Sequence, residues 1–220
     1  MNKNKHISTR VLVLAAALTA MVVVLQLLGS FIHLGVFSIS LVLVPIVIGA
    51  AVCGAGVGAW LGFVFGAVVL ISGDAALFFV VNPLGTILTV LAKGALAGLA
   101  SALVYKALSG VCKRAGEKSH SEAKFPALLK ARAVVLKYLP VVTAAIVCPI
   151  VNTGVFLVGC NLFFYGALTE WAVKYGFESA VKYMIFGLVG GNFIFELVFN
   201  MILSPVIVRV LSINEKIFKF

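Results

Sequence analysis

Hydrophobic side chains run through the chain in long stretches that short polar segments separate. A helix needs about 20 apolar residues to cross a hydrocarbon core of about 30 Å. On this basis the pattern predicts six membrane-spanning helices at about 11–29, 39–53, 55–72, 84–108, 138–164 and 184–211. The first apolar run is too long for the hydrophobic region of a signal peptide, so we expect it to be retained. The sequence thus predicts an all-α, polytopic integral membrane protein, with residues 1–220 forming a single membrane domain.

Composition supports this class. Of the 220 residues, 63% are hydrophobic and 11% are charged, and the mean hydropathy is +1.20. A soluble protein carries about a quarter charged residues, so the composition excludes a soluble enzyme. The net charge of +10 does not indicate a nucleic-acid-binding protein, because nearly all basic residues lie between the apolar runs. That placement is typical of contact with anionic membrane lipids.

The basic residues predict the orientation. Cytoplasmic segments of membrane proteins carry an excess of Lys and Arg. With six spans, Lys174 and Lys182 fall on one side, and Lys93 lies inside a span. The loop at 109–137 and both chain ends fall on the other side, so both termini and this loop are predicted to be cytoplasmic. Fourteen basic residues lie there: Lys3, Lys5, Arg10, Lys106, Lys113, Arg114, Lys118, Lys124, Lys130, Arg132, Lys137, Arg209, Lys216 and Lys219.

Small residues recur at helical spacing. Gly54, Gly58, Gly62 and Gly66 form one stripe on the third predicted helix, which indicates that another helix packs closely there. The fourth helix carries a similar pattern at Gly94, Gly98 and Ala102. On the first helix Ala16 and Ala20 share a face. Their AxxxA pattern is consistent with packing inside the bundle or with docking of a second protein.

Polar residues within the spans are candidates for a binding site, because burying them in a membrane costs free energy. Lys93 on the fourth helix and Glu196 on the sixth are expected at similar depth. Two interpretations remain open: a buried ion pair with asparagines as interhelical hydrogen-bonding groups, or a polar cavity between helices four, five and six that binds a small polar solute. The amides that accompany the charged pair are Asn152, Asn161, Asn192 and Asn200.

Asn82-Pro83 predicts a helix start, with Asn as N-cap and Pro in the first helical position. The free N–H groups of such a start could also face a ligand carboxylate. The sequence contains no HExxH and no GxxxxGK[ST] motif, and its cysteines have no CxxC spacing. We therefore expect no catalytic residues, no metal and no cofactor, and any ATP hydrolysis would occur on separate subunits.

Four features together resemble the substrate-binding (S) component of an energy-coupling factor (ECF) transporter. They are the run Leu41–Pro45, the Asn82–Thr86 segment leading to Lys93–Gly98, Val151–Gly154, and the AxxxA pattern at the base of the first helix. The resemblance covers the whole chain, and the stretch 82–98 is most similar to the pantothenate-type branch. It implies a multi-pass protein of the prokaryotic plasma membrane that captures a vitamin or related micronutrient from outside.

The resemblance also implies the partners: a transmembrane coupling subunit, which would dock on Ala16 and Ala20, and two cytoplasmic ATPase subunits. The loops at 29–40 and 73–83 would gate the site. Pantothenate is the preferred substrate, with folate, riboflavin, pyridoxine-like and thiamine-precursor ligands as alternatives, and the start Met1-Asn2-Lys3 lacks the Met-His of the metal-transporting members. The alternative function is a stand-alone channel or facilitator for a small polar solute. The implied substrate-binding residues are Asn82, Lys93, Asn152, Asn161, Asn192 and Glu196.

Overall fold

The computed structural model describes residues 8–31, 33–34, 37–38, 41–119 and 126–217. Its described elements are α1 (Thr9–Gly29), β1 (His33–Leu34), β2 (Phe37–Ser38), α2 (Leu43–Cys53), α3 (Ala55–Ser72), α4 (Ala76–Val81), α5 (Pro83–Ser119), α6 (Pro126–Phe163), α7 (Tyr165–Lys174), α8 (Ala180–Lys182), a π-helix (Tyr183–Val189) and α9 (Gly190–Ile217). Strands β1 and β2 form a minimal antiparallel pair. Five of the described helices are long and apolar enough to cross a membrane, and α2 is a shorter apolar helix. The expected all-α, polytopic fold is confirmed.

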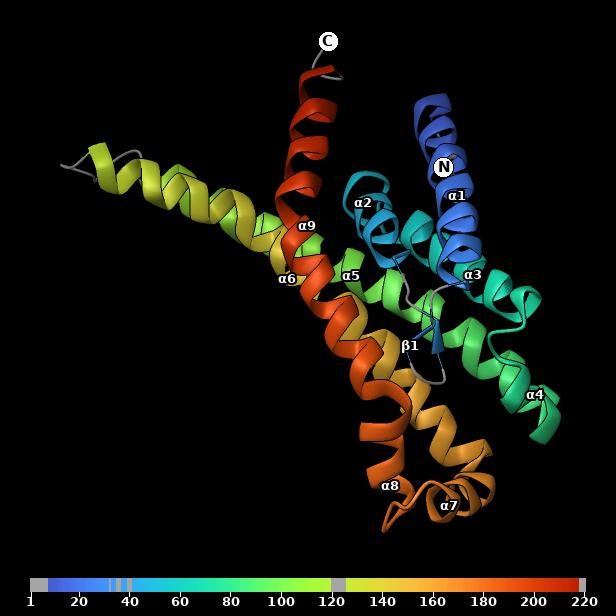
Figure 1. The fold of residues 1–220 in the computed structure, drawn as a ribbon. Helices are drawn as coiled ribbons and strands as arrows, with labels where there is room; N and C mark the ends of the chain where they lie inside the picture. The colour runs from blue at the N-terminus through green and yellow to red at the C-terminus, as the bar shows by residue number, and fades with distance from the viewer. Residues whose placement is uncertain (1–7, 32, 35–36, 39–40, 120–125, 218–220) are drawn as a thin grey trace, which may run out of the picture.

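The long helices form one bundle (Figure 1). Its centre is α2, which contacts α1, α3, α5, α6 and α9. All residues from Leu43 to Ala50 are buried, which explains why the sequence of this helix is hydrophobic on every side. Pro45 is tolerated because it lies in the first turn, where a backbone N–H has no partner within the helix. Gly54, with φ of 88°, ends α2 and begins α3, so a single left-handed residue reverses the chain.

Three predicted boundaries were wrong. Helix α2 begins at Leu43 rather than near residue 39, and its 11 residues extend about 16 Å at 1.5 Å per residue, half of a hydrocarbon core. The predicted polar loop at 109–137 is mostly helical, because α5 runs to Ser119 and α6 starts at Pro126. The polar segment after α6 contains α7. In the last two cases hydropathy marks where a helix loses its apolar character, which is not where the helix ends. Helix α2 differs, because the apolar residues Leu41 and Val42 precede its first turn.

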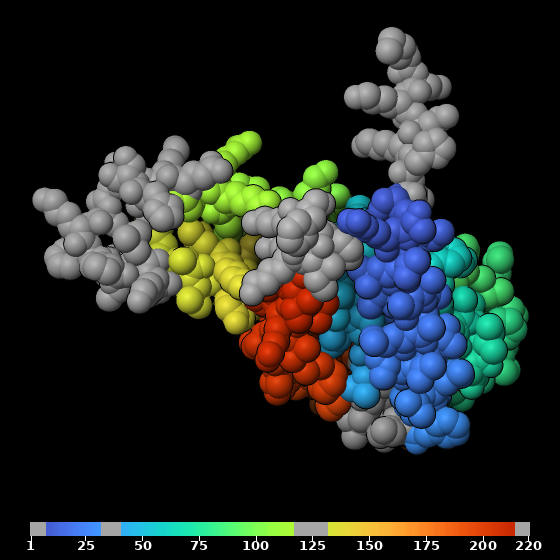
Figure 2. Space-filling view, turned by 90° about the horizontal axis from the view of Figure 1, so that it is seen from above, coloured from blue at the N-terminus to red at the C-terminus, as the bar shows by residue number. Residues whose placement is uncertain are grey.

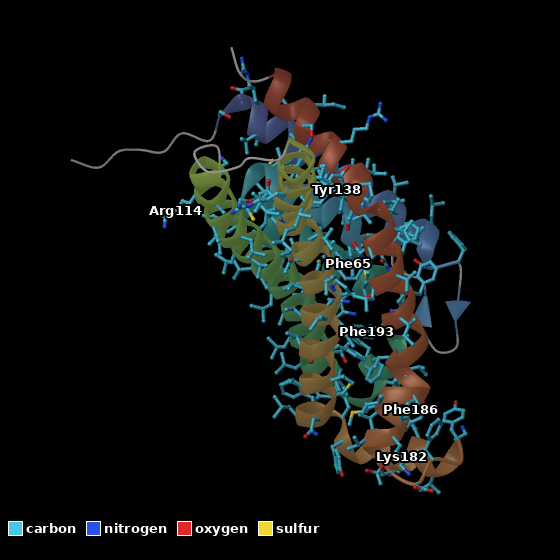
Figure 3. The ribbon with its side chains drawn as sticks, turned by 90° about the vertical axis from the view of Figure 1, so that its left-hand side faces the viewer. Phe65, Arg114, Tyr138, Lys182, Phe186 and Phe193 are labelled. Atoms are coloured by element: carbon cyan, nitrogen blue, oxygen red, sulfur yellow. The ribbon has the colours of Figure 1, made fainter. Side chains whose placement is uncertain are left out.

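The two ends of the bundle are formed by different parts of the chain. The first turn of α1 and the last turns of α9 lie at the same end in Figure 1, and α7 and α8 lie at the other. Seen from above in Figure 2, the α5–α6 hairpin extends sideways beyond the rest of the bundle. Figure 3 places Arg114 and Tyr138 toward the first end and Lys182 toward the second. The first described turn of the chain and the last thus share one side, as predicted, while the assignment of that side to the cytoplasm stays a prediction.

Glycines bring α3 and α5 into backbone contact. A Cβ atom added to Gly58 would lie 2.7 Å from the carbonyl oxygen of Gly98, and one added to Gly66 would lie 2.6 Å from that of Val90. Between them, Gly62 and Gly94 face each other so closely that neither position has room for a side chain. The predicted packing of the glycine stripe against another helix is confirmed, except at Gly54, which lies in the turn and faces open space.

This contact predicts that Gly62→Ala destabilises the protein by about 1–3 kcal/mol, because the added methyl group overlaps the backbone of α5. The measurement is thermal unfolding of the purified protein in detergent. Gly56→Ala is the matched control, since Gly56 lies on the same helix and a Cβ there meets nothing within 4 Å. Equal melting temperatures for the two variants would contradict close α3–α5 packing.

Candidate functional site

Three helices bring polar side chains together in the half of the bundle that lies toward α7 and α8. Lys93 comes from α5, Asn152 and Thr153 from α6, and Asn192 from α9. They line a cavity of about 30 Å³, and Lys93 and Asn192 also line a second cavity of about 30 Å³ further out. Each volume is sufficient for about two water molecules. The structure thus places three of the six sequence-predicted binding residues on adjoining cavities.

Glu196 lies next to these cavities, fully buried on α9. Its Oε1 accepts a hydrogen bond from Asn192 Nδ2 at 3.0 Å, and its Oε2 accepts one from Asn152 Nδ2 at 3.5 Å. The helical spacing of Asn192 and Glu196 makes the first bond possible, since residues four apart share a face. Asn200, on the same face, instead donates to the backbone oxygen of Glu196 at 2.8 Å. The carboxylate therefore ties α6 to α9.

Lys93 is held between aromatic rings. Its Nζ lies 5.6 Å from the centroid of Phe65 on α3 and 5.1 Å from that of Phe156 on α6. Cation–π contacts offset part of the cost of burying an ammonium group.

The outer cavity also contains polar residues that the sequence did not single out. Gln26 of α1 donates through Nε2 to Asp74 Oδ2 at 2.8 Å, and Ser72 donates to the same oxygen at 3.0 Å. Thr89 and Thr86 of α5 line the cavity about one and two turns from Lys93. A sequence signal existed for Gln26, because it is the one amide in an otherwise apolar span. Asp74 lies in a turn, so no periodic pattern indicated that it faces the cavity.

An aromatic cluster forms the far wall of the outer cavity. Phe78 of α4 is 3% exposed, and its ring makes edge-to-face contacts with Phe156, Phe164 and Trp171 at centroid distances of 5.5, 5.0 and 5.6 Å. Such pairs contribute about 0.5–1.5 kcal/mol each beyond area burial. Phe78 comes from α4, which is six residues long, whereas the other three rings come from α6, α7 and the junction between them.

Several buried acceptors have no donor within the described protein. They are Gln26 Oε1, Thr89 Oγ1, Asn152 Oδ1, Asn192 Oδ1 and Asn200 Oδ1, and the first four of these residues line the two cavities. Leaving such an atom unpaired costs about 1–3 kcal/mol. Plain structural packing would not concentrate this cost in one place. Water molecules or a polar solute in the cavities would supply the missing hydrogen bonds.

The remaining predicted binding residues lie away from the cavities. Asn82 caps α5, because its Oδ1 accepts from the N–H of Gly85 at 3.0 Å, as the Asn-Pro motif predicts. Asn161 is exposed on α6 and lines neither cavity. Helical periodicity explains the difference, since residues 152 and 156 face inward and residue 161 falls on the opposite side.

Ala16 and Ala20 lie on a separate surface. Both are exposed and line an apolar groove between α1 and α3, together with Gly56 and Trp60. Trp60 is half exposed, and its Nε1 donates to Thr19 Oγ1 at 3.2 Å across the groove. The alanines are therefore not used in packing the bundle, which leaves this face open to another protein.

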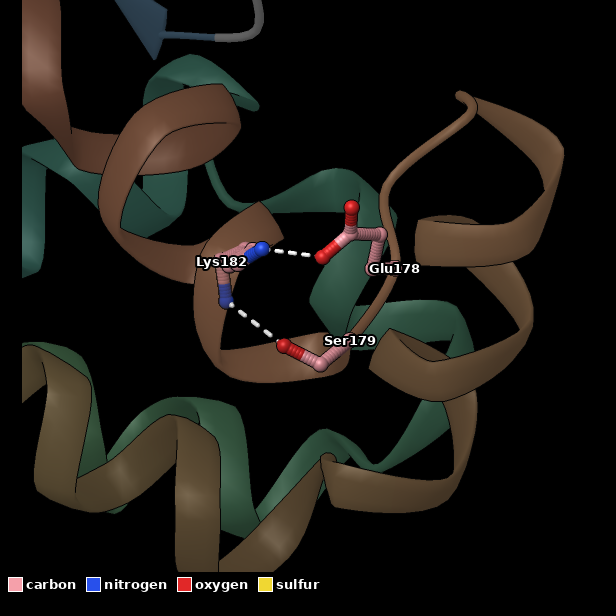
Figure 4. A network of polar contacts seen from close by, with 3 residues as sticks. All are labelled: Glu178, Ser179 and Lys182. Carbon is pink, nitrogen blue, oxygen red and sulfur yellow. Dashed lines mark hydrogen bonds and ion pairs between the residues drawn. The ribbon is translucent and has the colours of Figure 1, made fainter.

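The rim beyond the cavities is fixed by local polar contacts (Figure 4). The Ser179 hydroxyl accepts from the N–H of Lys182 at 3.3 Å, and the Lys182 ammonium pairs with Glu178. Both charged side chains are exposed, so the pair contributes little to stability. It orders the turn between α7 and α8, which precedes the π-helix and Asn192.

Comparison with known proteins gives one match. A family model described as "ECF transporter, substrate-specific component" matches residues 10–208 of the chain. No curated protein and no solved structure matches it.

The buried carboxylate gives a test of the network. Glu196→Ala should lower the free energy of unfolding by about 3 kcal/mol, because it strands two amides and the positive charge of Lys93. Adding Lys93→Met should recover part of this loss. The measurement is thermal unfolding in detergent, with Glu178→Ala as a control for removing an exposed carboxylate. A loss of equal size in the control, or no recovery in the double variant, would show that the two buried charges are not coupled.

Proposed function

Because the chain belongs to the family of ECF transporter substrate-specific components, we propose that it captures pantothenate outside the prokaryotic plasma membrane and delivers it to an ATP-driven transporter. Members of this family are membrane transport subunits rather than enzymes, and substrate-specific uptake follows from the family match. The identity of the solute is argued from the cavities. The observation that carries it is a lysine that lines the same two cavities as four buried oxygens without a hydrogen-bond partner.

The chemistry of the lining supports a solute with one carboxylate and several donors. Asp74 and Glu196 already accept hydrogen bonds from neighbouring amide and hydroxyl groups, whereas Lys93 meets aromatic faces. A carboxylate on the solute would pair with Lys93. The two hydroxyls and the amide N–H of pantothenate would supply donors to acceptors such as Gln26 and Asn192. Its methyl groups would pack on the phenylalanines.

Binding requires the site to open. Cavities for small molecules usually measure about 300–1,000 Å³, far above the two cavities of about 30 Å³. The resemblance assigned the gate to loops 29–40 and 73–83, and much of the first lies outside the described residues. In the second, Asp74, Ala75 and Phe78 line the outer cavity. We infer that α4 swings outward with Phe78 to admit the solute and that the aromatic cluster closes over it.

The groove between α1 and α3 is the proposed docking surface for the coupling subunit. Its exposed alanines allow a helix of the partner to approach the backbone of α1 closely. Trp60 would add a large, partly exposed ring of the kind that dominates protein interfaces. By this proposal, two cytoplasmic ATPase subunits supply the energy through the coupling subunit.

The proposed solute is tested by a thermal-shift panel. Pantothenate at 100 times its Kd should stabilise the folded protein by about 2.7 kcal/mol through mass action. Lys93→Met should abolish this shift because the carboxylate loses its cation. Lys106→Met is the matched control, since Lys106 is an exposed lysine of the same helix that lines neither cavity.

The other vitamins of the panel distinguish a wrong solute from a wrong function. A shift with riboflavin, folate, a pyridoxine-like compound or a thiamine precursor, and none with pantothenate, would overturn the solute while keeping the capture function. No shift with any of them, in a protein that unfolds cooperatively, would contradict the capture function as proposed.

The docking surface is tested by uptake. Ala16→Trp with Ala20→Trp should abolish ATP-dependent uptake by the reconstituted complex and leave the thermal shift with pantothenate intact, because the groove is separate from the cavities. Ala17→Trp with Met21→Trp is the control, since both residues are exposed on α1 but lie outside the groove. Unchanged uptake in the groove variant would refute docking here. Uptake by the protein alone in liposomes without ATP would favour the facilitator instead.

A further inference from the structure

A second groove lies at the basic end of the molecule, far from the cavities along α5. The α5–α6 hairpin diverges sideways from α9, as Figure 1 and Figure 2 show. The divergence leaves a wedge-shaped groove whose walls are α5, α6 and α9 and whose floor includes the end of α2. It is distinct from the docking groove, which lies between α1 and α3.

The groove is lined by apolar residues at one end and by basic residues at the other. Its deep end is apolar, with Val141 and Val208 buried against the bundle core. Its shallow end carries Lys113 and Lys137, both exposed, and the hydroxyl of Ser212. No carboxylate lies among the described residues that line it. An apolar slot that ends in two cations and a hydroxyl is complementary to an acyl chain with an anionic headgroup.

The helix register brings the two lysines close enough to share one headgroup. Ser101 Oγ donates to the carbonyl oxygen of Ala144 at 3.1 Å, which fixes how α5 and α6 pair. With that antiparallel pairing Lys137 stands opposite residue 108, so it lies about 7–8 Å from Lys113 along the hairpin at 1.5 Å per residue. Two lysine side chains span that distance readily.

We propose that this groove is a binding site for an anionic phospholipid, with Lys113 and Lys137 on the phosphate and an acyl chain along the apolar wall. The proposal does not depend on the identity of the transported solute. A lipid fits better than a free phosphate because most of the lining is apolar. It fits better than a protein helix because the positive charge sits at one end of the slot, where a lipid headgroup would lie. A lysine near an anionic membrane surface contributes about 1 kcal/mol, or about fivefold in affinity.

The test uses the full-length protein in detergent, with dioleoylphosphatidylglycerol or dioleoylphosphatidylcholine added. Native mass spectrometry reports the bound lipid, and the melting temperature reports stabilisation. The wild type should prefer phosphatidylglycerol. Lys113→Gln with Lys137→Gln should lower that preference about fivefold per lysine, and Lys113→Arg with Lys137→Arg should retain it. The melting temperature without lipid should be the same in all variants, because both side chains are exposed.

The matched control is Lys106→Gln with Arg114→Gln, which removes the same charge from α5 outside the groove. An equal loss in this control would overturn the proposal in favour of diffuse attraction. An unchanged preference in the groove variant would also overturn it, as would full competition by glycerol phosphate, which lacks acyl chains.

Loss of the complex with the coupling subunit, without loss of lipid preference, would make the groove a protein interface instead. Stabilisation by pantothenate should persist in both variants, so failure here is distinguishable from failure of the proposed solute.

Discussion

The backbone contact between α3 and α5 is the constraint on which the rest of the structure depends. Membrane helices have no hydrophobic driving force that favours each other over lipid, so they associate where small residues permit close packing. Gly62 and Gly94 provide that contact. Since Lys93 precedes Gly94 and Phe65 lies between Gly62 and Gly66 on α3, the same contact sets the ammonium over the Phe65 ring. Close packing of glycines, which have no side chain, thereby determines where the Lys93 ammonium group is held.

A charge held at this depth must be compensated within the protein. Lys93 is compensated by aromatic faces and by the nearby field of Glu196, whose own oxygens are bound by amides of α6 and α9. The charge of Lys93 is therefore compensated by several weak interactions rather than by one strong bond. Oxygens nearby, such as Gln26 Oε1 and Thr89 Oγ1, have no hydrogen-bond partner among the described residues. A protein with such a site can fold without the solute, and binding of a polar solute to the folded state stabilises it further.

The sequence predicted features that depend on local spacing and missed those that depend on how segments meet. The glycine stripe, the Asn82 cap and the polar face with Asn192 and Glu196 all follow from helical periodicity, and the structure places them as that periodicity requires. Asp74 reaches the cavity because a turn carries it under α1, which no pattern within one helix reveals. The hairpin was mistaken for a loop because hydropathy records polarity rather than backbone conformation. Asn161 was included on residue type alone, although its distance along α6 from Asn152 turns it outward.

The length of α5 connects the two ends of the molecule. Its 37 residues extend about 55 Å at 1.5 Å per residue, well beyond a hydrocarbon core of about 30 Å. Lys93 and Lys113 lie on this one continuous helix, twenty residues apart, and the inner cavity and the basic groove both have walls from α5, α6 and α9. A helix transmits tilt along its length, so a change in the angle between α5 and α9 at one end alters the spacing at the other. The inner cavity and the basic groove therefore share their walls, and the prolines within α6 and α9 (Pro140, Pro149 and Pro205) lie along those walls.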